Sequence, residues 1–202
     1  MDVTTASNQR PSSIPPADYG GNIDLRNLTV ESTLFLPVQI EGAGLYIGDP
    51  NFAQDNGEVA LTALEASLRA TLRAQVVPTA EDKRLFGRTD LPFAISHGTL
   101  IPMGFSSTLD DALSQSVEHA INMITAMFEM PRQQVYLLLS AAIDFDVTQA
   151  VDITKGVHGL IDLSMFQQLP AYERTIRDIG NSRRTAMRRM PYWPSRLRQV
   201  TD

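Results

Sequence analysis

The sequence contains no cysteine. Disulfide bonds, thiolate metal sites and a cysteine nucleophile are therefore excluded. Only three histidines are present, at positions 97, 119 and 158, and their scattered positions form no close-spaced metal motif. No apolar run approaches the ~18 residues of a membrane-spanning helix, and residues 1–16 lack the charged-then-apolar layout of a signal peptide. We therefore expect a cytoplasmic protein that does not act at a membrane.

Several functional motifs are also missing. No predicted strand leads into a GxGxxG or P-loop sequence, and no GxSxG elbow is present. Nucleotide binding and serine hydrolase chemistry therefore have little support. The net charge of −6 argues against a general attraction to nucleic acid.

Charge is distributed unevenly along the chain. From residue 166 onward, eight arginines stand against three acidic residues. We expect this basic tail to dock on an acidic surface, either of this chain or of a neighbour. A nucleic-acid-binding arm is the less favoured alternative, because the tail has no lysine and its apolar residues recur at helical spacing.

The composition is that of a globular protein, with 43% hydrophobic and 20% charged residues. We divide the chain into a flexible lead-in at residues 1–19, a main domain at 20–166 and a basic helical tail at 167–202. The predicted fold class is α+β. A predominantly β part with sandwich- or barrel-like strands comes first, followed by a β-α-α-β-β segment and the helical tail.

Alternating apolar residues predict strands, and the clearest alternation runs from Ser67 to Val77. Apolar residues at helical spacing predict helices, and Ser107 or Thr108 would cap the first of them. The predicted strands are 33–40, 45–48, 59–64, 67–77, 93–101, 145–153 and 157–163. The predicted helices are 108–129, 131–142 and 171–190, with a break at Gly180 left open, and residues 79–92 are predicted to be a polar connection.

An acidic run, Gly48 to Glu58, follows a predicted strand and holds carboxylates and amides between glycines. Loops at strand ends are where a rigid scaffold presents chemically active groups. A second such sequence, Gly20-Gly21-Asn22-Ile23-Asp24, lies upstream. These two segments are the predicted site.

Several ordered segments resemble motifs of the acetamidase/formamidase family. Gly20 to Asp24 is similar to its GGNMD, Asp49 to Glu58 to its GDxHxAQGDGE signature, and Ser140 to Asp152 to its S-x-A-x-D…Q-x-V-D segment. Leu25 to Pro37 and Lys155 to His158 resemble the family at the expected places, so the resemblance covers about residues 16–166. It implies a hydrolase that releases ammonia from short carboxamides such as formamide and acetamide. It also implies a largely β fold and a divalent metal, zinc or calcium.

The sequence departs from the family pattern in two ways. The family's histidine falls at Asn51, and one of its aspartates falls at Asn56. A family protein is also nearly twice as long, and its N-terminal half has no counterpart here. The resemblance therefore implies either one half of an amidase, with a partner chain or a homo-oligomer completing it, or a catalytically degenerate relative that serves as a binding or assembly module.

The expected catalytic residues are Glu58 and Asp49. Glu58 lies between Gly57 and an apolar segment, where burial would raise its pKa and suit it to acid/base work; the alternative is a carboxylate that ties down loop amides. Asp24, Asp49 and Asn51 are the expected oxygen ligands of a hard metal ion. The alternative for the aspartates is a turn closed by their own backbone hydrogen bonds.

The expected substrate-binding residues are Asn22, Gln54 and His158. An asparagine or glutamine side chain can donate to and accept from a primary amide at the same time. His158 lies in a family-like segment, whereas His97 is expected to be structural and His119 to lie at the surface or its boundary.

Overall fold

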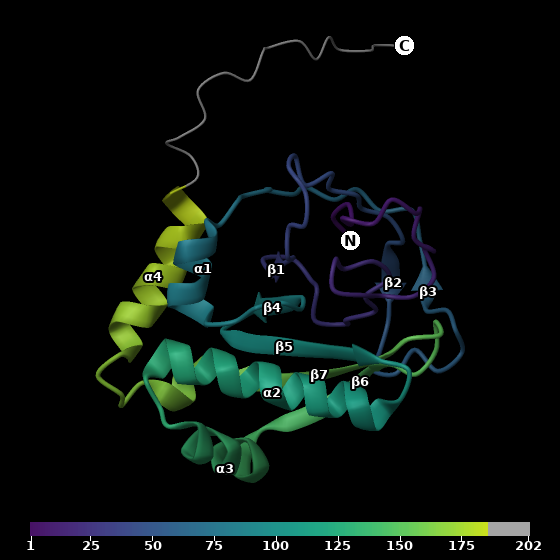
Figure 1. Ribbon diagram of the computed structural model, residues 1–202. Coiled ribbons are helices and arrows are strands. Elements are labelled where there is room, and N and C mark those ends of the chain that lie inside the picture. Colours follow the sequence, from purple (N-terminus) through teal and green to yellow (C-terminus); the bar gives the residue numbers. More distant parts are fainter. Residues whose placement is uncertain (186–202) are drawn as a thin grey trace.

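The computed structural model describes residues 1–185 (Figure 1). A five-stranded antiparallel sheet has the order β1-β4-β5-β7-β6, and a separate two-stranded sheet pairs β2 with β3. The strands are β1 (Thr33–Phe35), β2 (Asn51–Ala53), β3 (Leu64–Glu65), β4 (Phe93–Ser96), β5 (Thr99–Ser106), β6 (Asp144–Gln149) and β7 (Lys155–Asp162). The helices are α1 (Thr79–Phe86), α2 (Leu109–Phe128), α3 (Arg132–Ala142) and α4 (Tyr172–Thr185), with a short 3-10 helix at Leu163–Phe166.

The large sheet is covered on both faces. In Figure 1, α2 and α3 lie on one side of it and the N-terminal segments lie on the other. Side chains alternate across β5, so Leu100 packs with the helices while Ile101 and Met103 pack with Leu25 of the N-terminal part. The sheet therefore carries two hydrophobic clusters, one on each face.

Helix α2 packs closely on β5. Its N-cap is Thr108, whose Oγ1 accepts a hydrogen bond from the Asp111 amide at 3.2 Å. Gly104 of β5 permits the close approach, because a Cβ there would lie 2.2 Å from the carbonyl oxygen of Ala112. His119 of α2 is buried, and its Nδ1 lies 3.2 Å from the Met103 carbonyl oxygen. The expectation that His119 lies at the surface or boundary is therefore wrong.

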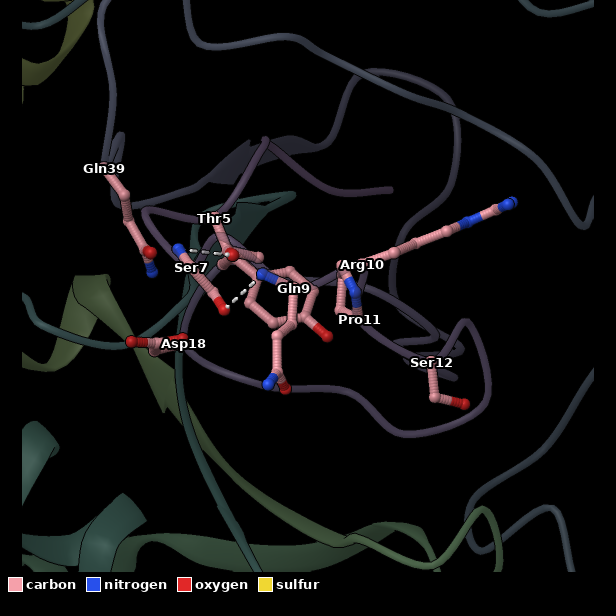
Figure 2. A pocket seen from close by; sticks show the side chains of 9 residues that line it. Thr5, Ser7, Gln9, Arg10, Pro11, Ser12, Asp18 and Gln39 are labelled. Carbon is pink, nitrogen blue, oxygen red and sulfur yellow. Dashed lines mark hydrogen bonds between the residues drawn. The ribbon is translucent and has the colours of Figure 1, made fainter.

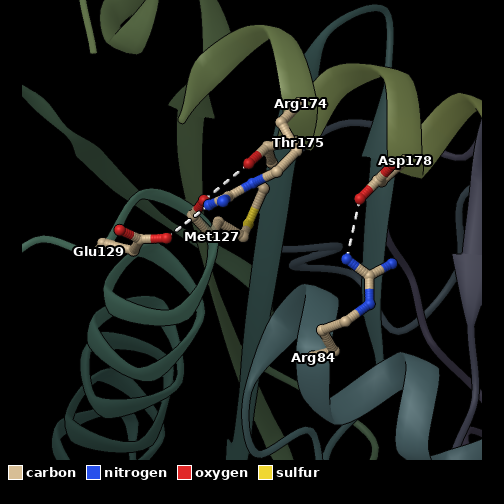
Figure 3. Close-up of polar contacts among 6 residues, drawn as sticks. All are labelled: Arg84, Met127, Glu129, Arg174, Thr175 and Asp178. Atoms are coloured by element: carbon tan, nitrogen blue, oxygen red, sulfur yellow. Dashed lines mark hydrogen bonds and ion pairs between the residues drawn. The ribbon is translucent and has the colours of Figure 1, made fainter. Parts of the chain in front are cut away.

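Helix α4 is attached to the helical layer by polar contacts (Figure 3). The buried Thr175 hydroxyl donates to the Met127 carbonyl oxygen at 2.7 Å. Asp178 accepts from Arg84 at 2.8 Å, and Glu129 accepts from Arg174 at 2.5 Å. Because exposed ion pairs contribute little, the buried hydroxyl and the packing of Ile179 carry most of this contact. The end of the predicted helix and the last part of the basic tail, residues 186–202, lie outside the described residues.

The α+β class and the helices are confirmed. The predicted helix over 108–129 is α2, the one over 131–142 is α3, and α4 passes through Gly180 without a break. The predicted strands 145–153 and 157–163 correspond to β6 and β7, each with shifted ends.

Several other predicted elements are wrong in extent or type. Residues 93–101 form a hairpin instead of one strand, because His97 and Gly98 both adopt positive φ, at 47° and 82°, and turn the chain. The predicted polar connection 79–92 contains α1. The strand predicted over 33–40 ends at Phe35, which precedes Pro37, and residues 45–48 and 59–63 contain no strand.

The strand predicted with the clearest pattern, Ser67 to Val77, is also wrong. The segment has neither helix nor strand, and nearly all of its residues are exposed. Alternation of apolar residues indicates that one face of a strand would be buried, but it does not show which other strand would pair with it.

The first residues of the predicted lead-in are tied to the main domain. Asp2 exchanges hydrogen bonds with Tyr46 at 3.0 and 3.1 Å, and Val3 is buried. These contacts place the N-terminal segment beside the Gly20–Asp24 sequence, since Gly21 also donates to the Met1 carbonyl oxygen at 3.0 Å.

Candidate functional site

Three segments that are distant in sequence meet at the end of β6. The acidic loop is tied there through Gly57, whose amide donates to the Thr148 carbonyl at 3.2 Å and whose carbonyl accepts from the Ala150 amide at 2.9 Å. Gly57 has φ of 93°, a conformation that glycine adopts without strain. The next residue, Glu58, is thereby held beside the turn that follows β6.

Gln149 joins the third segment to this point. Its side chain is fully buried, and its Oε1 accepts from the Asp24 amide at 3.3 Å. Its Nε2 donates to the Asn22 carbonyl at 3.1 Å and to Asp152 Oδ2 at 2.9 Å. One amide side chain therefore fixes the Gly20–Asp24 sequence against the turn that carries Asp152.

Asp24, Glu58 and Asp152 form a carboxylate cluster, in which one oxygen from each residue lies within 4.8 Å of the others. Asp24 and Asp152 are buried, and Glu58 is half-buried. Glu58 and Asp152 have positive φ, 39° and 61°, so both are held in a conformation that is strained for a residue with a side chain. Strain of this kind is common at functional sites.

The surroundings of the carboxylate cluster disfavour full ionisation. Burial, followed by hydrogen bonding to Glu58 and Asp152 and their negative charge, raises the pKa of Asp24 to about 9. Burial is also the main cause that raises the pKa of Glu58. Three carboxyl groups this close cannot all carry charge at neutral pH, so Asp24 holds a proton there.

A hollow of about 370 Å³ opens beside the acidic loop, and its lining includes Gln54, Asn56 and Glu58. Asp24 and Asp152 are not among its lining residues. Of the three clustered carboxylates, Glu58 is therefore the one that a small molecule in the hollow would contact.

A second hollow, of about 450 Å³, lies among the N-terminal residues (Figure 2). Its lining is mostly neutral and polar, with Arg10 and Asp18 as the charged side chains. It contains none of the clustered carboxylates, so the smaller hollow is the candidate functional site.

Amide side chains of the acidic loop carry unused hydrogen-bonding atoms. Asn51 Nδ2 donates to Gln54 Oε1 at 3.3 Å, and Asn56 Nδ2 donates to Asp146 Oδ2 at 2.8 Å. Within residues 1–185, the buried atoms Asn51 Oδ1, Gln54 Nε2 and Asn56 Oδ1 have no hydrogen-bond partner. Buried polar atoms are rarely left unpaired in native proteins, and those that are point to a ligand, an ion or water.

His158 is fully buried on β7, across from Asp146 of β6. Its Nδ1 shares a hydrogen bond of 2.8 Å with the Thr148 hydroxyl, and its Nε2 has no partner in the part of the chain that the structure describes. Burial lowers the pKa of His158 to about 4, so the ring is neutral at neutral pH.

The structure brings some of the predicted site residues together and leaves others apart. Asp24 and Glu58 meet in the carboxylate cluster, and Asn51 and Gln54 pair within the loop. Asp49 is exposed and outside the cluster, although its charge is felt by Glu58. The Asn22 side chain turns away and donates to the Ile14 carbonyl at 3.1 Å, so that only its main chain contributes to the site.

Two residues of the site, Asp152 and Gln149, were not expected from the sequence. The signal was present, because Gln149-Ala150-Val151-Asp152 is the Q-x-V-D segment that resembles the family. The sequence alone does not connect this segment to Asp24.

The donor set of the carboxylate cluster suits a hard cation. Three carboxylates supply only oxygen, which calcium and magnesium prefer. Asp24 Oδ2 is buried and has no hydrogen-bond partner among the described residues, as expected of an oxygen that would face a cation. Zinc sites usually include nitrogen or sulfur ligands besides oxygen, and the carboxylate cluster contains no histidine.

Together, the antiparallel sheet backed by helices and the carboxylate cluster beside a hollow define an α+β protein with an acidic candidate site. The Acetamidase/Formamidase family matches residues 2–168. The chain therefore belongs to the acetamidase/formamidase family. Among residues 1–185, no helix is both long and apolar enough to cross a membrane.

Curated relatives share short stretches with this chain. A formamidase from Methylophilus methylotrophus is 45% identical over 47 residues, which cover 23% of this chain and 12% of the relative. An acetamidase from Mycolicibacterium smegmatis is 43% identical over 53 residues, covering 26% of this chain and 13% of the relative. These matches therefore leave most of each relative's length uncovered.

Solved structures share the fold over most of this chain. An acetamidase from Bacillus halodurans superposes with a TM-score of 0.67 at 23% identity, covering 84% of this chain and 55% of that one. An acetamidase from Yersinia enterocolitica gives a TM-score of 0.68 at 22% identity, covering 83% and 48%. This chain therefore spans about half the length of the family structures it matches.

Proposed function

We propose that the carboxylate cluster is the acid/base site of an amidase that hydrolyses short linear carboxamides, of the formamide or acetamide type, and releases ammonia. The observation that carries the proposal is the convergence of Asp24, Glu58 and Asp152 beside the hollow. Family membership supports the reaction class, since formamidases and acetamidases are among the relatives.

Glu58 is the proposed acid/base residue. Amide hydrolysis needs a base to take a proton from water and an acid to deliver one to the leaving nitrogen. Glu58 lines the hollow, and its raised pKa lets it hold a proton between these steps. Burial raises the pKa of Glu58 most, the negative charge of Asp152 raises it further, and a hydrogen bond with Asp24 lowers it.

Gln54 and Asn56 suit the recognition of a primary amide. Both line the hollow. The unpaired Gln54 Nε2 offers a donor for a substrate carbonyl, and the unpaired Asn56 Oδ1 offers an acceptor for a substrate N–H. Expected contacts of Asn22 and His158 with the substrate have less support, because the Asn22 side chain turns away and His158 is buried.

Asp24, Glu58 and Asp152 would hold a divalent cation, for which their oxygen-only donor set favours calcium over zinc. When bound, such an ion would polarise a carbonyl oxygen or lower the pKa of a water molecule. Binding would also displace the proton from Asp24, since the ligand is the ionised carboxylate.

The working enzyme is proposed to contain a partner that supplies the rest of the family fold, since this chain spans about half of the matched structures. The alternative is a degenerate relative that acts as a binding module, suggested by Asn51 and Asn56 at the family's histidine and aspartate positions. The assembled carboxylate cluster favours the enzyme. A cytoplasmic location and the lack of a nucleic-acid partner stay predictions from the sequence.

The test is a Glu58→Gln variant, assayed for ammonia release from formamide and acetamide in the assembly purified from its source. We expect turnover to fall by about 100-fold or more, because general acid/base groups contribute on that scale. The matched control is Glu41→Gln, which changes an exposed carboxylate outside the lining of the hollow and should retain activity. Unchanged turnover in Glu58→Gln, with the same melting temperature, would overturn the assignment.

A further inference from the structure

The segment from Ser67 to Val77 is an apolar strand pattern without a partner. Leu68, Leu72 and Val76 are exposed by 55%, 51% and 67%. Within residues 1–185, no hydrogen bond joins the main chain of this segment to another residue. In Figure 1 it runs as an open tube between β3 and α1.

Alternation gives this segment two different faces. Leu68, Leu72 and Val76 fall on one side, and Arg69, Thr71 and Arg73 fall on the other. An extended segment with free main-chain groups and one apolar face is a template to which another strand can add.

Exposed apolar residues continue into the preceding chain, where Val59, Leu61 and Leu64 also face solvent. Exposed apolar residues that gather in one patch often mark an interaction site. Residues 59–77, of which Val59 and Leu64 also line the smaller hollow, are therefore taken together as the candidate docking surface.

The family fold indicates what covers this surface. Matched acetamidase structures contain roughly as much chain again as the part that superposes on this one, because the match covers 84% of this chain but 55% of the Bacillus halodurans protein. We propose that Ser67–Val77 is the strand on which a partner polypeptide, carrying the portion of the acetamidase/formamidase fold not matched here, adds its own β-strand. This rests on the proposed two-part assembly and names its contact.

The charges of the segment specify the partner strand further. Arg69 and Arg73 are exposed and have no ion pair with any described residue. A partner strand therefore presents apolar side chains toward Leu72 and acidic side chains toward these arginines. A second copy of this chain would instead set Leu72 against Leu72 and bring two arginine pairs to one interface, without an acidic complement.

The experiment places the photo-crosslinker p-benzoylphenylalanine at position 72 of the full chain, expressed in its source cells. Adducts are separated under denaturing conditions and identified by mass spectrometry. We expect an adduct with a polypeptide that matches the missing part of the family fold. An adduct containing only two copies of this chain would overturn the proposal. So would a yield no greater than that from the crosslinker at Leu137, an exposed position on α3.

A second measurement compares Leu72→Asp with Leu137→Asp. Both side chains are exposed, so neither change should alter the melting temperature. Leu72→Asp should lower recovery of the partner by more than about tenfold, because a charge would enter an apolar contact, while Leu137→Asp should not. Equal recovery from the two variants would contradict the proposal. The readout is independent of catalysis, so Glu58→Gln should leave the adduct intact even where ammonia release is lost.

Discussion

At the scale of single residues, the site depends on Gln149 as much as on its carboxylates. The amide side chain of Gln149 makes three hydrogen bonds, to the Asp24 amide, the Asn22 carbonyl and Asp152. Each of these groups is at least partly buried, so each would lose a partner that water could not readily replace. Gln149 is therefore a positioning residue for the carboxylate cluster.

Gln149→Ala is expected to destabilise the chain by about 1–3 kcal/mol, the usual cost of leaving buried polar groups unpaired. Chemical denaturation measures this change. The matched control is Gln134→Ala, at an exposed position of α3, which should change the free energy of unfolding by less than about 0.5 kcal/mol. Equal stability of the two variants would show that the Gln149 contacts do not hold the site.

The sequence predicted some of the site and missed its third member. Asp24, Glu58 and Asp152 each lie in a short family-like motif, but only the first two belong to the segments predicted as the site. Asp152 belongs to a third segment, and its meeting with Asp24 is produced by the Gly57 contacts at the end of β6 and by Gln149. Contacts between residues so far apart in the sequence leave no periodic pattern along the chain. Composition and spacing therefore could not reveal them.

At the scale of elements, the packing of α2 on β5 depends on Gly104. A Cβ at this position would lie 2.2 Å from the Ala112 carbonyl oxygen and 2.6 Å from the Ser116 amide nitrogen. Both atoms belong to the α2 backbone, which cannot move aside without shifting the helix.

Gly104→Ala is therefore expected to destabilise the chain by about 1–3 kcal/mol or more, the range for overpacking a core. Gly180→Ala in α4 provides the opposite control, because a Cβ there meets nothing within 4 Å. It should stabilise the helix by roughly 0.5–1 kcal/mol, since alanine is the better helix former. Thermal melting of the two variants should shift in opposite directions, and a shift in the same direction would contradict this account of the packing.

Helices were predicted from the sequence more accurately than strands. The sequence of α2 itself indicates its start through Thr108, which caps it, and its length through the apolar spacing. A strand needs a neighbour, and the sequence does not state which segment that is. Ser67–Val77 has the best alternation in the chain but no strand partner among residues 1–185, whereas β4 and β5 pair across the tight turn at His97 and Gly98.

At the scale of the whole molecule, the sheet, the acidic loop and the exposed segment have different roles. The sheet and helices form the core and hold the end of β6 in place. The acidic loop and the Gly20–Asp24 sequence bring the carboxylates to that end. The apolar surface at residues 59–77 is the proposed contact for a partner. If that proposal holds, the isolated chain is expected to fold stably and to reach full activity only in the assembly.

Asp24 is held protonated near neutral pH by its burial and by its two carboxylate neighbours. The most direct measurement is an NMR titration of ¹³C-labelled aspartate carboxyls, with the Asp24 signal assigned by its loss in Asp24→Asn. In the presence of a chelator, the account predicts an apparent pKa of about 9 for Asp24, falling well below this value when calcium saturates the carboxylate cluster. An Asp24 signal that titrates near about 4 without calcium, the ordinary value for an aspartate, would contradict the account.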